Sequence, residues 1–249
     1  MDDSIGGRVA VVTGGTGGIG AAICSALAEA GFTVVIGYNS SSAQAETLAR
    51  ELPGTGHMAL PAPVTDSPAL AVLAATVGDR FGRVDLLVNC AGMTRFVEHG
   101  NLDALDDALI DAIFNVNVRG VIAATRAFRP LLKEAPDGLV VNISSIAGVT
   151  AMGSNIAYCA SKAAVDNLTR SLARALAPEI RVVSVSPGLV DGDYAQSFDP
   201  AWRNAQVERT PMKRLATPQD VGAAIVAVAN DLPFTTGAII PVDGGRPLA

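Results

Sequence analysis

The chain contains 249 residues, of which 49% are hydrophobic, 17% are charged and 4% are aromatic, and its formal net charge at pH 7 is −6. An acidic chain without a cluster of Lys or Arg is a poor candidate for binding nucleic acid or an anionic membrane surface. A small anionic ligand is still allowed, because backbone amides can bind one locally. The length and the aliphatic composition favour one α/β domain built around a buried parallel sheet.

Three widely spaced cysteines, Cys24, Cys90 and Cys159, occur without a CxxC motif. This usage predicts free thiols in a reducing compartment, and the simplest role for all three is that of small buried side chains. His57 and His99 have no ligand-like neighbours, so no metal site is expected. The acidic N-terminal segment is unlike a signal peptide, and no apolar run reaches the roughly 18 residues of a membrane span. We therefore expect a cytoplasmic protein without a membrane partner.

Strand-like and helix-like patterns alternate along the chain. Short β-branched runs predict strands at 8–13, 32–38, 57–62, 84–89, 139–144, 181–186 and 238–242. Helical spacing of apolar residues predicts helices at 18–30, 42–52, 67–81, 106–133, 157–177, 199–209 and 218–230. This alternation predicts one α/β domain over 1–249, a doubly wound, Rossmann-type parallel sheet of about seven strands with helices on both faces.

A glycine-rich loop, VVTGGTGGIG at 11–20, joins the first predicted strand to the first helix. Gly14, Gly18 and Gly20 allow a tight turn and let backbone amides approach a pyrophosphate at the positive end of the helix dipole. A turn alone would explain two glycines, but the strand–loop–helix context favours a nucleotide site.

Tyr158 and Lys162 lie four residues apart on a predicted helix and so share one face. A phenol with a pKa of about 10 is a poor acid or base at neutral pH unless a nearby cation favours the phenolate. On spacing alone, a simpler interpretation is an amphipathic helix on which the tyrosine packs and the lysine extends to solvent.

Several further motifs occur in a fixed order. They are NCAG at 89–92, NVRG at 117–120, NISS at 142–145, YCASK at 158–162, SPG at 186–188 and VDGG at 242–245. Together with the TGxxxGxG pattern of the glycine loop, they resemble the short-chain dehydrogenase/reductase family over essentially the whole chain. Within that family the chain is most similar to 3-oxoacyl-[acyl-carrier-protein] reductases and acetoacetyl-CoA reductases.

The resemblance implies a set of catalytic residues. Tyr158 would give a proton to a carbonyl oxygen or take one from an alcohol, and Lys162 would lower the pKa of Tyr158 and hydrogen-bond the nicotinamide ribose. Ser145 would hold the substrate oxygen, and Asn117 would anchor a water linking Lys162 to solvent.

Two of these assignments have a neighbouring competitor in the sequence. Ser144 is the alternative to Ser145, and Asn115 is a weaker alternative to Asn117.

The end of the second predicted strand bears on cofactor choice. It reads Tyr38-Asn39-Ser40, without the acidic residue that binds the ribose 2′-OH of NAD and repels a 2′-phosphate. NADP(H) is therefore the expected cofactor, with NAD(H) as an alternative. The resemblance implies a cofactor site made by Gly14, Thr16, Gly18, Ile19, Gly20, Tyr38, Asn39, Ser40, Val64, Asn89, Ala91, Gly92, Tyr158, Lys162, Pro187, Gly188 and Val190.

The substrate region is predicted from the same resemblance. A lid would span about 190–214 and contribute Tyr194 and Trp202, while Met93 and Arg95 would face it beside Ser145. Arg95 would meet an anionic substrate or simply be solvated. The predicted helices at 106–133 and 157–177 are apolar on more than one face, which fits the homotetramers or homodimers common among similar proteins.

Three functions follow as hypotheses. The first is reduction of a carbonyl, with a 3-oxoacyl thioester as the expected substrate. The second is oxidation of a sugar, a polyol or another secondary alcohol. The third is a non-catalytic NAD(P)-sensing protein, against which the complete set of Ser145, Tyr158, Lys162 and Asn117 argues.

Overall fold

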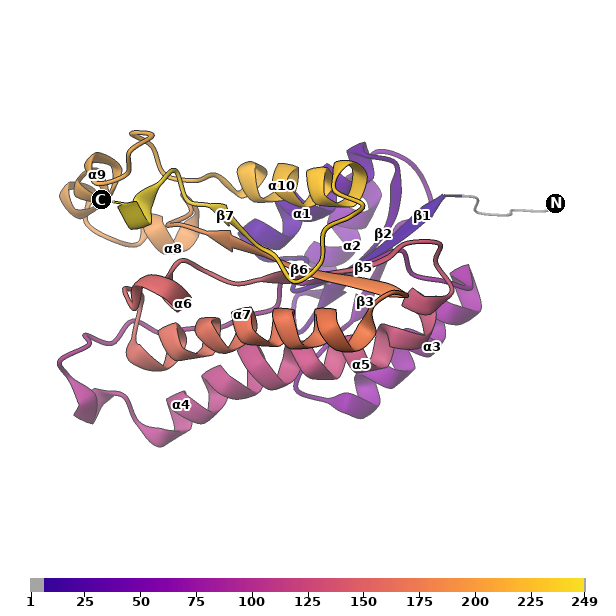
Figure 1. Ribbon diagram of the computed structural model, residues 1–249, viewed down its shortest axis with the longest axis horizontal. Helices are drawn as coiled ribbons and strands as arrows, with labels where there is room; N and C mark the ends of the chain where they lie inside the picture. Colours follow the sequence, from indigo (N-terminus) through magenta and orange to yellow (C-terminus); the bar gives the residue numbers. More distant parts are fainter. Residues whose placement is uncertain (1–6, 249) are drawn as a thin grey trace.

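The computed structural model describes residues 7–248 and contains the predicted parallel sheet (Figure 1). Seven strands lie in the order β3-β2-β1-β4-β5-β6-β7, and every neighbouring pair is parallel. Their bounds are β1 Arg8–Thr13, β2 Phe32–Tyr38, β3 Met58–Pro61, β4 Leu86–Asn89, β5 Gly138–Ile143, β6 Ile180–Pro187 and β7 Ile239–Val242. The strand order reverses between β1 and β4, where open α/β sheets bind ligands. The expectation for the N-terminal segment falls largely outside the described residues.

Helices cover both faces of the sheet (Figure 1). One layer contains α1 Gly18–Glu29, α2 Ser42–Glu51 and α10 Pro218–Asp231. The other contains α3 Ser67–Phe81, α4 Asp107–Phe114, η2 Asn115–Arg119, α5 Gly120–Lys133 and α7 Ile156–Leu176. The remaining helices are η1 Leu102–Ala104, α6 Ala147–Thr150, α8 Asp193–Gln196, α9 Pro200–Glu208 and η3 Arg246–Leu248.

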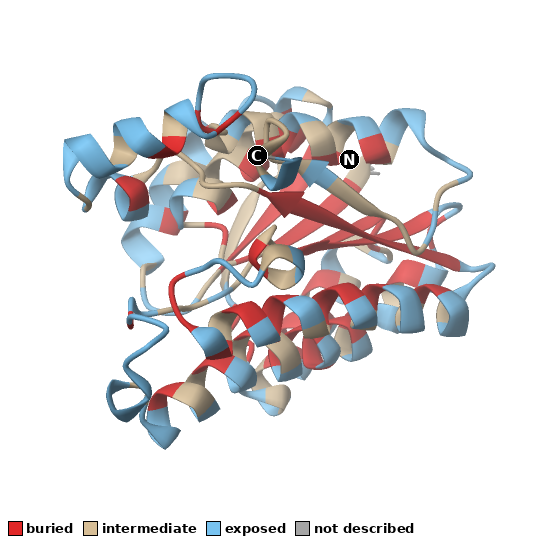
Figure 2. Cartoon of the chain, turned by 60° about the vertical axis from the view of Figure 1, so that its left-hand side comes forward, coloured by how far each residue is buried: buried red, intermediate tan, exposed pale blue. Residues whose placement is uncertain are grey.

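Two aliphatic cores explain why the strands are apolar along their length. Ala10 and Val12 of β1 pack in the core beneath α1 and α10, whereas Val9 and Val11 pack in the core beneath α3 and α5. Successive strand residues point to opposite faces, so a parallel sheet covered on both sides needs apolar residues at nearly every position. The inner strands β1, β2, β4, β5 and β6 are accordingly buried along most of their length, whereas the outer strands β3 and β7 are only partly buried (Figure 2).

The helix predicted at 106–133 is continuous in the structure but contains one π turn. The Gly120 amide donates to the carbonyl of Asn115, five residues earlier. This stretch, Asp107–Lys133, has the length and hydropathy of a membrane span. It packs against α3, α7 and strands β4 and β5, so its apolar side forms part of the protein core.

Candidate active site

The glycine loop after β1 is shaped by contacts that exclude side chains. Gly14 has φ +66°, and a Cβ on it would lie 2.8 Å from the Ala91 Cα atom. A Cβ on Gly20 would lie 2.1 Å from the Gly14 carbonyl oxygen. By contrast, a Cβ on Gly18 would meet nothing within 4 Å, and α1 begins there without a side-chain cap or an acid in its first turn. The residues present therefore fit a pyrophosphate at this helix N-terminus.

Other predicted cofactor residues surround this loop. The Thr16 carbonyl accepts a hydrogen bond from Gln44 at 3.1 Å, which ties the loop to α2. The Thr13 hydroxyl accepts hydrogen bonds from the amides of Cys90 and Ala91, both at 3.2 Å. These bonds hold the segment after β4 against the glycine loop, and Ile19 packs partly buried below it.

The Asn89 side chain points into the interior of the protein. Its side chain is buried and donates to Thr125 at 3.2 Å and to Asn142 at 2.9 Å, inside the α5–α7 side of the sheet. The Asn142 amide continues the chain of hydrogen bonds to Thr169 at 2.9 Å. The Asn89 side chain therefore stabilises the interior, and only its backbone lies at the ligand edge.

The end of β2 carries no carboxylate. Tyr38 is half-buried, Asn39 and Ser40 are exposed, and α2 has no acid in its first turn. Val64 is buried and would contact a Cβ on Gly120 at 2.9 Å, so the π turn region packs closely against it.

The segment after β6 is fastened to its neighbours through its backbone. The Pro187 carbonyl accepts from the Ile146 amide at 3.0 Å, and the Gly188 amide donates to the Val242 carbonyl at 3.0 Å. Val190 forms an isolated bridge with Ala216, which anchors the start of the lid.

Asn117 is the central hydrogen-bonding residue of the site. Its Oδ1 atom accepts from the Met93 amide at 2.8 Å, and its Nδ2 atom donates to the Met93 carbonyl and to Ser161 Oγ, both at 3.1 Å. Ser161 in turn donates to the Tyr158 carbonyl at 2.7 Å. The amide side chain thus joins η2, the loop after β4 and α7, and the anchoring of a water by Asn117 stays a prediction.

Asn115 lies outside the site. It is exposed, and its Oδ1 atom accepts a hydrogen bond from the Arg119 guanidinium at 2.9 Å on the outer surface of the helix. Of the two candidate asparagines, the structure brings only Asn117 to the catalytic residues.

Ser145 and Tyr158 face each other across the site. The Ser145 hydroxyl lies near enough to the phenol to oppose the rise in its pKa, whereas the neighbouring Ser144 side chain is buried on the other side. Burial nevertheless dominates and raises the pKa of Tyr158 to about 12. The phenol therefore keeps its proton at neutral pH.

Lys162 is buried, and its Nζ atom donates to the Ile143 carbonyl at 2.8 Å. Burial lowers the pKa of this lysine to about 8, and the same atom lies 5.7 Å from the centre of the Tyr158 ring. The ammonium is turned toward the β5 backbone, and the lowering of the Tyr158 pKa by Lys162 stays a prediction. A Cβ on Gly92 would lie 3.8 Å from Lys162 Nζ and 3.5 Å from Asn117 Oδ1, so Gly92 keeps this corner open.

The predicted substrate residues separate into two groups. Met93 packs into a small apolar cluster with Val97, Leu109 and Ile113, and Arg95 forms an exposed ion pair with Asp106 at 3.3 Å. Neither therefore presents a free side chain to the site.

Tyr194 and Trp202 lie in an aromatic group at the rim, with Phe96 and Phe198. Phe198 stacks on Trp202 with centroids 4.5 Å apart and meets Tyr194 and Phe96 edge-on at 5.2 and 5.8 Å. Tyr194 also lies close enough to Tyr158 to raise the Tyr158 pKa, although burial is the larger cause of this rise. The lid and the loop after β4 therefore share one apolar rim.

Sequence reasoning missed Asn155, which positions Tyr158. The Asn155 Oδ1 atom caps α7 by accepting from the Tyr158 amide at 2.7 Å. Its Nδ2 atom donates to the Arg95 carbonyl at 2.7 Å and to Thr94 Oγ1 at 3.2 Å. An Asn directly before an apolar helical pattern is an N-cap signal that could have identified it.

Comparison with known proteins agrees with this geometry. Residues 14–246 match the family model described as Enoyl-(Acyl carrier protein) reductase. The chain is 38% identical to cis-4-hydroxycyclohexanecarboxylate dehydrogenase of Sinomonas cyclohexanicum, over 98% of each chain. It is 35% identical to acetoacetyl-CoA reductase of Allochromatium vinosum, over 96% of this chain and 98% of that protein.

A solved structure shows the same likeness in three dimensions. The 3-ketoacyl-(acyl-carrier-protein) reductase of Brucella melitensis, complexed with NADH, superposes with a TM-score of 0.88 at 30% identity, covering 96% of this chain and 98% of that one.

The fold and the matches define an oxidoreductase that uses a nicotinamide cofactor and acts on CH–OH or C=O groups. The chain belongs to the short-chain dehydrogenase/reductase family. Its similarity to 3-oxoacyl and acetoacetyl reductases extends over nearly the full chain.

Proposed function

We propose that this enzyme reduces a ketone to a secondary alcohol with NADPH, using Tyr158 as the proton donor. The observation that carries this proposal is the meeting of Ser145, Tyr158 and Lys162 beside the open N-terminus of α1 at the carboxyl edge of the sheet. A sensing protein would need the cofactor loop but not this arrangement of proton-bearing groups.

Each catalytic side chain has one task in this proposal. The Tyr158 hydroxyl transfers its proton to the substrate oxygen, and the Ser145 hydroxyl donates a hydrogen bond that holds the same oxygen. Lys162 stabilises the tyrosinate that forms, once its ammonium turns from the Ile143 carbonyl toward the site. A bound nicotinamide supplies the hydride. In the direction of alcohol oxidation, the same groups work in reverse.

NADP(H) is the proposed cofactor, with NAD(H) as the alternative. The preference is supported by the absence of a carboxylate at Tyr38-Asn39-Ser40 and in the first turn of α2. An acid there would repel a 2′-phosphate, whereas neutral hydroxyl and amide groups can hydrogen-bond it.

A 3-oxoacyl thioester is the first proposed substrate. The similarity to an acetoacetyl-CoA reductase and to 3-oxoacyl-[acyl-carrier-protein] reductases supports it. Arg95 does not add to this support, because Asp106 already pairs with it.

A cyclic secondary alcohol or the corresponding ketone is the second candidate. The observation that favours it is the aromatic rim made by Phe96, Tyr194, Phe198 and Trp202, because aromatic side chains pack well against a ring. The relative from Sinomonas cyclohexanicum acts, by its name, on such a ring alcohol.

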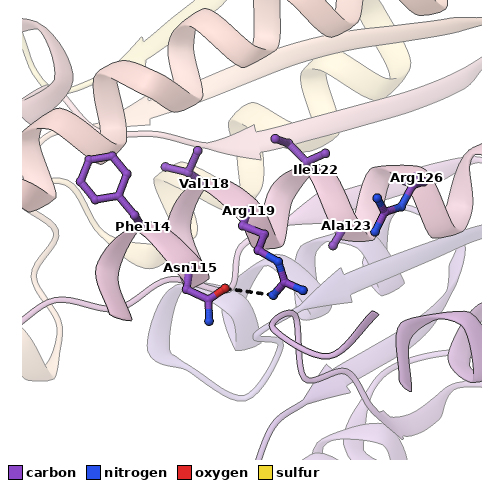
Figure 3. A pocket seen from close by; sticks show the side chains of 7 residues that line it. All are labelled: Phe114, Asn115, Val118, Arg119, Ile122, Ala123 and Arg126. Atoms are coloured by element: carbon purple, nitrogen blue, oxygen red, sulfur yellow. Dashed lines mark hydrogen bonds between the residues drawn. The ribbon is translucent and has the colours of Figure 1, made fainter. Parts of the chain in front are cut away.

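We further propose that the enzyme is a homotetramer or homodimer located in the cytoplasm. Figure 3 shows a hollow along the outer side of α4, η2 and α5, where Phe114 is 36% and Ile122 is 40% exposed beside Val118. Burial of these apolar groups against a second copy would explain their exposure in one chain. Mass measurement in solution tests this assembly.

The enzymatic proposal is tested by a substrate panel assayed with both cofactors. We would measure oxidation of NADPH and NADH by acetoacetyl-CoA, by a neutral acetoacetyl thioester and by cyclohexanone derivatives, and the reverse reaction with polyols. NADPH-dependent turnover of a thioester supports the first candidate, and turnover restricted to ring ketones supports the second. Cofactor binding without turnover of any compound would favour a sensing protein and contradict the enzymatic proposal.

A further inference from the structure

The proposed catalytic set leaves one buried acid unexplained. Asp166 lies one helical turn after Lys162 on α7, and the two residues are only 4% and 7% exposed. Residues four apart share one helical face, and here that face is turned to the sheet. An acid at such a position is costly to bury unless it has a partner or a task.

The polar groups around Asp166 are incompletely satisfied. Its Oδ1 atom and the Ser144 Oγ atom have no hydrogen-bond partner among residues 7–248. Ser144 and Ser184 line the sheet side, and both serines are buried. Burial raises the pKa of Asp166, and the Ser144 hydroxyl, the Arg170 guanidinium, the Lys162 ammonium and the Ser184 hydroxyl oppose that rise. The neighbouring hydroxyls and cations thus favour the charged carboxylate, against the burial that favours the neutral acid.

Few other groups near Lys162 can carry a negative charge. The groups that face it are the Tyr158 ring, the Cys90 thiol and Asp166, together with the Ile143 carbonyl and the uncharged Asn117 amide. Burial raises the pKa of Cys90 to about 11 and that of Tyr158 to about 12, so both are neutral near pH 7. Asp166 is the remaining acid in this set.

We propose that Asp166 is a positioning residue that keeps Lys162 in its charged form from the interior side of the site. Asp166 does not touch substrate in this assignment; it acts through Lys162. Loss of the negative charge would destabilise the ammonium relative to the neutral amine, so Lys162 would lose its proton at a lower pH. The kinetic consequence rests on the proposed function, but the protonation of Lys162 can be measured without it.

The direct test is an NMR titration of the full chain labelled with 13C at the lysine ε-carbons. The chain has only three lysines, at positions 133, 162 and 213, and Lys162→Arg identifies the signal of interest. We expect the wild-type Lys162 midpoint near pH 8 and a downward shift of about one pH unit or more in Asp166→Asn, the order expected for charges one helical turn apart at an effective dielectric constant of about 20.

A matched control comes from an exposed ion pair. Glu179 lies 3.5 Å from Lys133 with both side chains substantially exposed, so Glu179→Gln should leave the Lys162 midpoint unchanged. Asp166→Ala serves if the asparagine variant does not fold. An unchanged Lys162 midpoint in the folded variant, or an upward shift, would overturn the proposal.

The pH dependence of the kinetics distinguishes this proposal from the enzymatic one. If the enzyme reduces ketones, the alkaline limb of its kcat/KM profile should move to lower pH in Asp166→Asn by the same amount as the NMR midpoint. If the Lys162 midpoint shifts in Asp166→Asn but the wild-type protein turns over no substrate, the Asp166 proposal is retained and the enzymatic proposal is rejected. A merely structural role for Asp166 would change stability but would move neither profile.

Discussion

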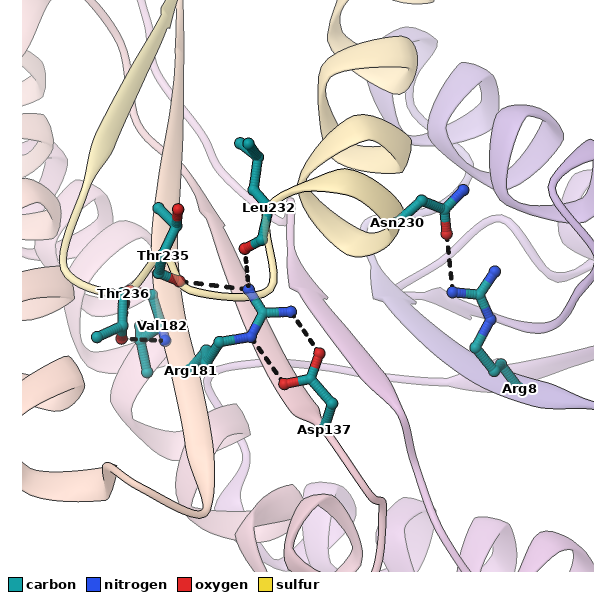
Figure 4. Close-up of polar contacts among 8 residues, drawn as sticks. All are labelled: Arg8, Asp137, Arg181, Val182, Asn230, Leu232, Thr235 and Thr236. Atoms are coloured by element: carbon teal, nitrogen blue, oxygen red, sulfur yellow. Dashed lines mark hydrogen bonds and ion pairs between the residues drawn. The ribbon is translucent and has the colours of Figure 1, made fainter.

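Buried charged side chains at the two edges of the sheet differ in how completely they are hydrogen-bonded. At the amino edge, Arg181 is 8% exposed and makes four hydrogen bonds: it donates to both Asp137 oxygens at 2.8 and 2.7 Å and to the carbonyls of Leu232 and Thr235 (Figure 4). At the carboxyl edge, within residues 7–248, Lys162 has one carbonyl partner and the Asp166 Oδ1 atom has no hydrogen-bond partner.

This difference separates a structural role from a chemical one. A buried charge that makes most of its hydrogen bonds holds the fold in one arrangement, and removing its partner is costly. A buried charge with bonds left unmade lowers stability but keeps a proton or a hydrogen bond available for a substrate. The comparison can be tested at both edges.

The largest expected effect is at Tyr158. Tyr158→Phe removes the proton donor while keeping the ring, so kcat for ketone reduction should fall about 1000-fold, within the range for loss of a general acid. Stability should change little. Steady-state kinetics and urea unfolding measure the two quantities, and Tyr194→Phe is the control for loss of a phenol at the rim. Equal activity of Tyr158→Phe and wild type would rule out the assigned role.

A substitution at the amino edge should change the stability of the protein but not its activity. Asp137→Ala leaves the Arg181 guanidinium buried with only carbonyl partners, which should lower the free energy of unfolding by about 3 kcal/mol. Glu208→Ala breaks the exposed pair with Lys213 and should cost less than about 0.5 kcal/mol. Urea denaturation measures both. The comparison fails if Asp137→Ala reduces kcat of the folded protein as strongly as it reduces stability.

Lys162→Met should raise the free energy of unfolding, whereas Asp137→Ala should lower it. The pKa of Lys162 is about 8 in the folded chain and about 10.4 in an unfolded one, so the lysine destabilises the fold most fully below pH 8. Methionine should raise the free energy of unfolding at pH 7 by about 2 kcal/mol, after loss of the hydrogen bond to Ile143, while abolishing turnover. Because the wild-type penalty fades between pH 8 and about 10.4, the gain should shrink over that range in pH-dependent urea denaturation. A less stable Lys162→Met at pH 7 would contradict this reasoning.

The smallest expected effect concerns cofactor choice at the end of β2. Tyr38→Asp introduces the missing carboxylate, which should shift the ratio of NADPH to NADH dissociation constants about tenfold toward NADH. Tyr38→Asn removes the ring without adding charge, so the difference between the two variants isolates the electrostatic part. Fluorescence titration with both cofactors provides the ratio. Tighter NADH than NADPH binding by wild type would contradict the proposed preference.

Local pattern was sufficient for the fold, and the site was located by combining that pattern with the resemblance to a known family. The strand and helix order, the parallel sheet and the glycine loop follow from periodicity and from residue types that admit few backbone conformations. The pairing of Tyr158 with Lys162 follows from helical spacing. These features depend on residues within a few positions of one another, so the sequence by itself determined them.

Tertiary contacts decided which groups are available for chemistry. The choice of Ser145 over Ser144 to face Tyr158, and of Asn117 over Asn115, depends on side-chain directions set by the sheet and by a π turn. The pairing of Arg95 with Asp106, too, was not resolved by sequence reasoning.

The protonation of Tyr158 and Lys162 was decided in the same way. Both pKa values are governed by burial, which is the sum of contacts from several strands and helices. The sequence therefore determined which residues meet at the carboxyl edge, and the tertiary structure determined which of them hold a proton there, because desolvation and hydrogen bonding arise only when distant segments pack together.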